Sequence, residues 1–507
     1  MADKDSPASA APATAQRSFI FRLSLFQWFV RLLPAILYFL HSYSKQGPYQ
    51  PPACVSFGIN CPHATTPISG IFERPDHYGQ VLRYYASLFA KSEDLGGSFA
   101  VFVDGRQVID VYAGFKDLAK TVPYTNTTLQ QVYSSGKALE GIVIARLVEQ
   151  GRLDYSKRIS EYWPEFGQNG KEDVRLEDLM THESGVPHVD DDVEDATAEA
   201  LTWAHLADEE NFSDRLARKA HLFNGEKTRA YHALSRGWYL NEIVRRVDPK
   251  GRTISQIVEE DIMSAYSDTE FYYSKLPNTS DWEERLSVMH DYPLLRIAGR
   301  LLIPRFIQTN RFFGQPDLLP LHTIVKRMTI GGKSLTARVL TPKIAPWAYS
   351  FRTKEAHAVE STSFSLKTNA HSFAKLMSMM ANKGAAIRPG EPDLLSGEAY
   401  AKATTFHAVK TDQVTEEVLP LSTGGWVKTR DFYGDGPLKG VEIQGWGGAG
   451  GSLMVWIEEL NIGFAYVTNA FGPPETLLGD YRAKTLLDRV VYARKEELGL
   501  LQKVPKE

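Results

Sequence analysis

Residues 132–166 read VYSSGKALEGIVIARLVEQGRLDYSKRISEYWPEF, and this stretch decides the fold. Its apolar residues recur at helical spacing from about Ser134 to Gln150, and Gly151 then ends the helix. Ser134 and Lys137 form an S-x-x-K pattern, whose spacing projects a hydroxyl and an amine from the same face of a helix. The free backbone N–H groups at a helix N-terminus stabilise negative charge on an attacked carbonyl oxygen. The stretch therefore predicts a helix that begins with a nucleophile and an amine.

The S-x-x-K pattern by itself is weak, because it also occurs at Ser42/Lys45 and at Ser372/Lys375. Ser42 follows an N-terminal apolar segment, and Ser372 lies inside HSFAKLMSMMANKG, which has the pattern of an ordinary amphipathic helix. Ser134 differs from both, since it opens a helix after a predicted hairpin. The context therefore favours Ser134 as the candidate nucleophile.

Other common catalytic signatures are missing from the sequence. There is no G-x-S-x-G or H-E-x-x-H pattern, and the run Gly331-Gly332-Lys333-Ser334 lacks the leading glycine of a P-loop because Arg327 stands there. The two cysteines, Cys54 and Cys61, show no spacing with His that is typical of a zinc site. They either close one short loop or are unrelated thiols. The sequence predicts no metal and no cofactor.

The segments near the two ends of the chain have strand and helix patterns. Residues 96–117, GGSFAVFVDGRQVIDVYAGFKD, are two alternating runs joined at Asp104-Gly105, which is a strong hairpin signal, and a helical pattern over 77–92 precedes them. Strand-like runs over 451–459 and 462–470 precede an amphipathic helical pattern over 475–498. This arrangement predicts one sheet that is closed by distant parts of the chain.

Composition excludes two broad classes of protein. The chain has 507 residues, with 57 Lys plus Arg against 61 Asp plus Glu, and a formal charge of -4. A general nucleic-acid binder needs a basic excess to neutralise phosphates, so no nucleic-acid partner is expected. A content of 43% hydrophobic residues excludes wholesale disorder. The length allows two or three domains, or one large domain with insertions.

The N-terminal region divides into three parts. Residues 1–16 are rich in Ala, Ser and Pro and are typical of a disordered lead, residues 17–44 are strongly apolar, and residues 45–70 have the composition of a linker. Arg22, Arg31 and Pro34 interrupt the apolar part, so its uncharged run is too short for the roughly 30 Å hydrocarbon core of a membrane. We expect membrane association through residues 17–44, as an interfacial helix or a single span with snorkelling arginines. A targeting peptide or a buried helix is the alternative.

The compartment is left open by the sequence. Lys and Arg residues before the apolar segment favour a cytoplasmic N-terminus with the bulk lumenal or extracellular. N-x-[ST] sequons at Asn126, Asn211 and Asn278 agree with that orientation. A mitochondrial presequence is the rival interpretation, which Asp3 and Asp5 disfavour.

Several ordered blocks of the chain resemble one known family. Residues 132–166, followed by LEDLMTHESGVP at 176–187, resemble the serine β-lactamase-like family, which includes penicillin-binding proteins, class C β-lactamases and related esterases. Blocks at 96–114, 231–247, 365–384 and 445–469 are similar to the same family in the same order. The resemblance implies an α/β (α+β) fold, with an antiparallel sheet flanked by helices and a mainly helical subdomain. Residues 71–507 would form this domain, with insertions near 188–225 and 285–345.

The resemblance also implies roles for individual residues. Ser134 would be the acylated nucleophile and Lys137 the amine that assists its deprotonation. Tyr231, in Tyr231-His232-Ala233, would act with Lys137 as general base and return the proton to the leaving group. The third motif is Trp446-Gly447-Gly448, which would bind substrate on an inner strand whose glycines allow close approach. The backbone N–H groups of Ser134 and Ala449 would form the oxyanion hole.

Two departures from the family pattern bear on the substrate. Ala233 replaces the asparagine that binds the substrate amide in lactamases, and Trp446 replaces a Lys or His that helps to hold a β-lactam carboxylate. Both changes remove polar recognition and resemble the esterase branch, in which we expect an aromatic wall over a small acyl or ester substrate. His182 and His232 are expected to be structural residues.

Alternatives to ester hydrolysis remain open. β-Lactamase, D-aminopeptidase or acyltransferase activity would use the same acyl-enzyme. A membrane-tethered or filament-forming scaffold with weak or no activity, and therefore a homo-oligomer, is the alternative from a different class.

Overall fold

The computed structural model describes residues 27–28, 30–38, 47–50, 54, 67–189, 201–274, 284–293, 334–340, 353–430, 436–472 and 479–501. Residues 1–16, residues 294–333 of the expected second insertion, the sequon at Asn278 and the S-x-x-K pattern at Ser42 lie outside the described residues.

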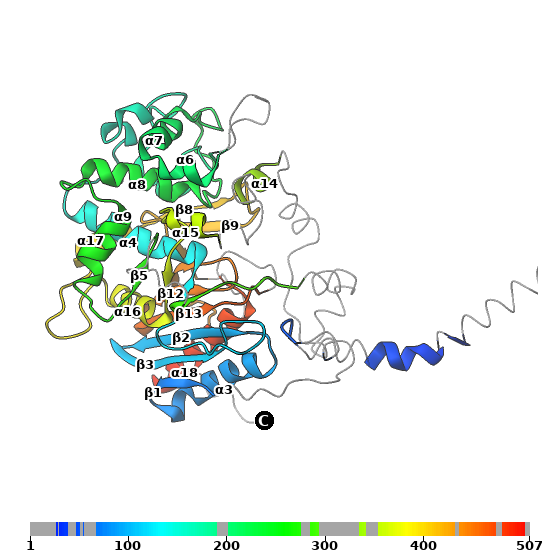
Figure 1. The fold of residues 1–507 in the computed structure, drawn as a ribbon. Coiled ribbons are helices and arrows are strands. Elements are labelled where there is room, and N and C mark those ends of the chain that lie inside the picture. Colours follow the sequence, from blue (N-terminus) through cyan, green and yellow to red (C-terminus); the bar gives the residue numbers. More distant parts are fainter. Residues whose placement is uncertain are drawn as a thin grey trace, which may run out of the picture.

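The centre of the protein is an antiparallel sheet of nine strands (Figure 1). Its strands lie in the order β1-β3-β2-β13-β12-β11-β10-β9-β8. The bounds are β1 (Ser69–Phe72), β2 (Gly96–Val103), β3 (Arg106–Gly114), β8 (Phe406–Thr411), β9 (Val418–Ser422), β10 (Val427–Thr429), β11 (Ile443–Gly447), β12 (Leu453–Ile457) and β13 (Ile462–Thr468). The hairpin prediction is confirmed, because β2 and β3 pair across Asp104 and Gly105, which both have positive φ angles of 51° and 74°.

Helices cover both faces of this sheet. The helices are α3 (Pro75–Ala90) and α18 (Tyr481–Glu497), which pack together, and α16 (Ala370–Ala381), which packs on β2, β12 and β13. Ser98 of β2 accepts a hydrogen bond from the first backbone N–H of α16, whereas the next residue, Phe99, contacts the Tyr85 ring of α3. Consecutive side chains of a strand point to opposite faces, so the sheet lies between these helices. The predicted α+β fold is confirmed.

A second layer of helices and a small sheet lies beside the large sheet (Figure 1). The small sheet has the order β5-β7-β4-β6. Its strands are β4 (Leu129–Gln131), β5 (Phe271–Tyr272), β6 (Leu286–Ser287) and β7 (Lys367–Thr368). The helices are α4 (Lys137–Glu149), α5 (Leu176–Met180), α6 (Trp203–Ala207), α7 (Glu209–Arg218), α8 (Ser235–Val247), α9 (Ile254–Ile257), α14 (Leu335–Leu340), α15 (Lys354–Ala358) and α17 (Gly397–Ala403), with short helical turns η1 (Tyr133–Gly136), η2 (Ile159–Glu161), η3 (Pro164–Phe166), η4 (Val258–Met263) and η6 (Glu458–Leu460).

Helix α4 is buried on more sides than its sequence pattern predicts. The pattern gives one apolar stripe, but every residue from Lys137 to Ala145 is buried, including Glu140. Gly141 allows this, because a side chain there would lie 2.8 Å from the Trp426 ring, whose indole N–H donates to the Ala138 carbonyl. Helix α4 is therefore a central helix, fixed between the sheet and the other helices.

The N-terminal region differs from the expected linker. Residues 47–50 are buried against the domain, and residues 69–70 belong to β1, although both were expected within a linker over 45–70. Cys54 forms a disulfide bond, and Cys61, the other cysteine of the chain, lies outside the described residues. Within the described ranges, the structure contains no helix that combines the length and apolarity needed to cross a membrane.

Close packing of α16 on β13 gives a test of the fold. A β-carbon on Gly463 would lie 2.3 Å from the Ser378 backbone nitrogen, so Gly463→Ala should force α16 away from the sheet and lower the free energy of unfolding by about 1–3 kcal/mol. Gly397→Ala is the control, because no atom lies within 4 Å of the new β-carbon at the start of α17. Urea denaturation should show a lower midpoint for Gly463→Ala alone, and equal midpoints for the two variants would contradict this packing.

Candidate active site

The turn that carries Ser134 is held by the loop between β11 and β12. Strand β4 leads into the short turn η1, in which Tyr133 has a positive φ of 48°, an uncommon conformation for an aromatic residue. The Ser452 hydroxyl donates to the Val132 carbonyl over 3.0 Å. A β-carbon on Gly448 would lie 2.1 Å from that same carbonyl oxygen, so only glycine allows this approach. The loop thereby brings Ala449 to the turn of Ser134.

Ser134, Lys137 and Tyr231 meet in space although 97 positions separate the serine from the tyrosine. The Tyr231 hydroxyl donates to Ser134 Oγ over 2.6 Å, and Lys137 Nζ lies 3.4 Å from the same oxygen. Ser134 is partly exposed, whereas the side chains of Lys137 and Tyr231 are buried. Of these three hydrogen-bonded residues, Ser134 is therefore the one that solvent or substrate can reach.

Lys137 is held by two backbone carbonyl groups. Its Nζ donates to the Ala233 carbonyl over 2.8 Å and to the Ser363 carbonyl over 2.9 Å. Burial, and then the nearby charge of Arg236, hold the pKa of Lys137 well below its usual range. A neutral amine has two N–H donors and one lone pair, so the two carbonyl bonds leave the lone pair for the Ser134 hydroxyl.

Tyr231 retains its proton at neutral pH. Burial raises the pKa of Tyr231 to about 12, although its hydrogen bond with Ser134 lowers the pKa in part. A phenol with this pKa donates a hydrogen bond and does not accept a proton near neutrality. The resemblance implies a shared general-base role for Tyr231 and Lys137; in the structure the protonated Tyr231 is a hydrogen-bond donor to Ser134.

A buried ion pair that the sequence analysis missed supports the site. Arg236 and Glu140 lie 2.7 Å apart with fully buried side chains, and Arg236 also donates to the backbone carbonyl of Lys137. Thr362 and Ser363 donate to the Glu140 carboxylate over 2.6 and 3.1 Å. The sequence does contain a signal for this pair. Glu140 lies one turn after Lys137 in α4, Arg236 lies five residues after Tyr231 in α8, and each is a charged residue in a helix with many apolar positions.

Trp446 has a different position from the expected wall of an open pocket. It lies on β11 as predicted, but it is 0% exposed and stacks on the Tyr231 ring at a centroid distance of 6.0 Å. His182 contacts both rings, and Arg236 lies 5.6 Å from the Trp446 centroid. The indole therefore fixes the position of Tyr231. Gly447 is the last residue of β11 and pairs with Leu453. The Val132 backbone carbonyl packs against Gly448, at a position where we expected substrate.

The two histidines of the region are neutral and buried. His232 Nε2 lies 2.8 Å from Ser184 Oγ, and its Nδ1 lies 2.6 Å from the Ala230 carbonyl. Burial lowers the pKa of His232 to about 3 and holds that of His182 well below its usual range. Because Ser184 is also fully buried, this serine–histidine pair has no access to substrate.

The second S-x-x-K pattern does not form a similar site. Ser372 is fully buried, and its hydroxyl donates to Asn369 within its own helix. The Lys375 amine forms ion pairs with Asp268 and Glu391 instead of contacting a serine. The part of the chain that the structure describes also holds no group of three or more His, Cys, Asp or Glu side chains placed to bind a metal.

Known proteins resemble this chain in sequence and in fold. The sequence model of the β-lactamase family matches residues 85–488. The chain is 35% identical over 170 residues to the esterase/β-lactamase LipL of Mycobacterium tuberculosis, a match that spans 34% of this chain and 37% of LipL.

Solved structures match over a longer range. A penicillin-binding protein homologue from Caulobacter crescentus is 25% identical, with a TM-score of 0.66 over 84% of this chain and 100% of that one. A family VIII carboxylesterase has a TM-score of 0.63 at 22% identity, over 84% of this chain and 100% of its own, and shows the same fold.

Removing the charge of Glu140 tests the support of the site. Glu140→Gln leaves the Arg236 guanidinium buried without a countercharge, so we expect a loss of about 3–5 kcal/mol in the free energy of unfolding. Asp173→Asn is the control, because the Arg158–Asp173 pair has the similar distance of 2.9 Å but side chains that are 56% and 85% exposed. The control should change stability by less than about 1 kcal/mol. Similar urea midpoints for both variants would show that the buried pair is dispensable.

Proposed function

Because this chain belongs to the β-lactamase family, we propose that it is a serine hydrolase that forms an acyl-enzyme on Ser134 and hydrolyses carboxylic esters. The observation that carries the proposal is the contact of one partly exposed hydroxyl with a buried lysine and a buried tyrosine that donates to it. Membership of the family and the esterase relatives support a hydrolase. The serine mechanism and the preference for esters are our inference.

The reaction begins with proton transfer from Ser134. Its hydroxyl gives the proton to the lone pair of Lys137, and Ser134 Oγ forms a bond to the ester carbonyl carbon. The hydrogen bond from Tyr231 stabilises the negative charge that develops on Oγ before attack. As the ester C–O bond breaks, Tyr231 gives its proton to the leaving alkoxide and recovers a proton from Lys137. Water then repeats the sequence on the acyl-enzyme and releases the acid.

The negative charge on the carbonyl oxygen requires its own donors. We assign this role to the backbone N–H groups of Ser134 and Ala449, which the contact of Gly448 with Val132 brings to the same turn. Removing one such donor typically lowers kcat by about 100-fold to 1,000-fold. The Ser452–Val132 bond and the glycine at 448 therefore matter for catalysis through the position of the loop.

The surroundings of the site favour an uncharged ester. Ala233 contributes a backbone carbonyl to Lys137 and no side-chain amide for a substrate. Trp446 occupies the place of a cationic group and is buried against Tyr231, so it supplies no positive charge to a substrate carboxylate. These two features weigh against β-lactams and towards neutral esters. Acyl transfer to another alcohol would use the same acyl-enzyme.

An inactive scaffold predicts a different site. An inactive scaffold does not need a reactive Ser134. In this protein Ser134 is nevertheless partly exposed, while Lys137 and Tyr231 are buried and lie within hydrogen-bond distance of its hydroxyl. Burying a lysine costs stability, and ionisable groups with perturbed pKa values cluster at functional sites. Catalysis explains this arrangement better than assembly alone.

Covalent labelling tests the nucleophile. Wild-type protein should react with a fluorophosphonate probe, and Ser134→Ala should abolish the labelling because the probe forms its bond with Oγ. Ser372→Ala is the matched control, since it removes the serine of the other described S-x-x-K pattern and should leave labelling intact. Labelling that persists in Ser134→Ala, or its absence in folded wild type, would refute the proposal.

The pH dependence tests the roles of Lys137 and Tyr231. Lys137 acts as a base only when neutral, and its pKa is lowered, so kcat/KM should fall only when the pH drops through this lowered pKa. The rate should then stay level until Tyr231, with a pKa of about 12, loses its proton. Rates of p-nitrophenyl butyrate hydrolysis from acid to alkaline pH provide the measurement. An acid limb centred near the ordinary lysine pKa of about 10.4 would rule out a neutral Lys137.

A further inference from the structure

The helix within residues 27–38 exposes a broad apolar face, with Gln27 and Arg31 on the remaining side. Trp28, Leu32 and Ile36 lie on one side, while Val30, Leu33 and Leu37 lie on another, and all the described residues of this helix are exposed. Figure 1 shows the helix away from the body of the protein. A helix with a broad apolar face and a charged residue on the remaining side is typical of a membrane interface.

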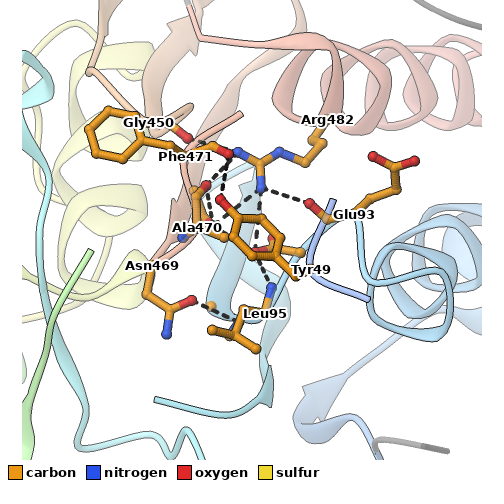
Figure 2. A network of polar contacts seen from close by, with 12 residues as sticks. Tyr49, Glu93, Leu95, Gly450, Asn469, Ala470, Phe471 and Arg482 are labelled. Carbon is orange, nitrogen blue, oxygen red and sulfur yellow. Dashed lines mark hydrogen bonds and ion pairs between the residues drawn. The ribbon is translucent and has the colours of Figure 1, made fainter. Parts of the chain in front are cut away.

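The chain returns to the protein soon after this helix, at a defined place. Tyr49 is buried, and its hydroxyl donates to the carbonyls of Phe471 over 2.7 Å and His290 over 3.2 Å (Figure 2). The backbone N–H groups of Gly47 and Tyr49 donate to the carbonyls of residues 91 and 92. Nine residue steps separate residue 38 from residue 47, so the helix ends within about 30 Å of this attachment.

The attachment adjoins the loop that carries Ala449. The Phe471 ring lies 5.9 Å from the ring of Tyr133, the residue before Ser134. The next backbone N–H, that of residue 472, donates to the Gly450 carbonyl, which also accepts from Arg482 over 2.7 Å (Figure 2). The N-terminal arm is therefore fastened beside the candidate active site.

Exposed apolar side chains surround the same attachment. Leu118, Val122 and Val288 are 59%, 43% and 45% exposed. They belong together, because His290 Nε2 lies 2.8 Å from the Lys116 carbonyl and the Lys116 backbone N–H donates to the Val122 carbonyl. The same surface carries three lysines, Lys91, Lys116 and Lys120, together with the carboxylate of Asp117, and Lys116 and Lys120 are partly exposed. We call the three apolar residues and the three lysines the contact face. Apolar side chains mixed with lysines suit the interface of an anionic lipid bilayer.

We propose that the N-terminal helix and the contact face bind a lipid bilayer together, and that the substrate of Ser134 is a long-chain ester drawn from that bilayer. This inference rests on the proposed ester hydrolysis. The short tether ending at Tyr49 holds the rim of the site, at Phe471 and His290, close to the membrane surface. A lipid ester then reaches Ser134 without passing through water, and a site without a cation for a substrate carboxylate suits such a neutral ester.

The experiment compares two substrates of the full-length protein. One is p-nitrophenyl oleate embedded in vesicles of phosphatidylcholine and phosphatidylglycerol, and the other is p-nitrophenyl butyrate in solution. The helix variant is Leu33→Asp with Leu37→Asp, and the contact-face variant is Leu118→Asp with Val122→Asp. The control is Val409→Asp with Val418→Asp, which changes apolar residues of similar exposure, 57% and 55%, on the edge strand β8 and its neighbour β9. A fourth protein carries about 20 Gly and Ser residues inserted after Lys45.

Co-sedimentation with the vesicles and the ratio of the two rates are the readouts. The helix and contact-face variants should bind the vesicles less and lose about tenfold in the ratio of vesicle to soluble hydrolysis, while the control keeps the wild-type ratio. The longer tether should retain binding but lower the ratio, because it separates the site from the surface. Wild type that fails to sediment, or equal ratios in all variants, would overturn this inference alone. Failure to hydrolyse soluble butyrate would instead overturn the proposed ester hydrolysis.

Discussion

The buried ion pair between Glu140 and Arg236 is the interaction on which the candidate site depends. It joins α4, which begins at Lys137, to α8, which follows Tyr231 in the chain. Arg236 also faces the ring of Trp446, so one guanidinium links the helices to the inner strand β11. Burial is the main reason that the pKa of Lys137 is lowered, and the positive charge of Arg236 lowers it further, whereas Glu140 opposes this shift.

Close backbone approach is the second constraint, and it determines where small residues stand. The glycine at 448 lets the loop after β11 touch the carbonyl of Val132, and the glycine at 141 lets α4 accept the Trp426 ring. At each of these two glycines another part of the protein fills the space that a side chain would take. Neither glycine therefore leaves room for substrate. Among the three residues of the candidate site, Ser134 is the one that is partly exposed.

Local patterns predicted much of this molecule, and tertiary contacts account for what they missed. Asp104-Gly105 specified a hairpin because both residues accept positive φ, and the spacing of Ser134 and Lys137 placed two groups on one helical face. The burial of Trp446 was not predictable, since it depends on a tyrosine 215 positions away. The packing of Tyr49 was missed for the same reason: its Pro- and Gly-rich surroundings are typical of a linker, and its partners lie near residues 290 and 471.

The pairing of β2 with β13 affects the state of the chain while it is being translated. Gly97 pairs with Thr468, 371 positions later, so β2 has no partner on that side until nearly the whole sequence exists. At about 5–20 residues per second, a ribosome needs roughly 20 to 75 s to make that partner. During this interval the early hairpin presents an open, apolar strand edge, which is prone to aggregation. The order of the strands therefore leaves the β2 edge open until β13 has been made.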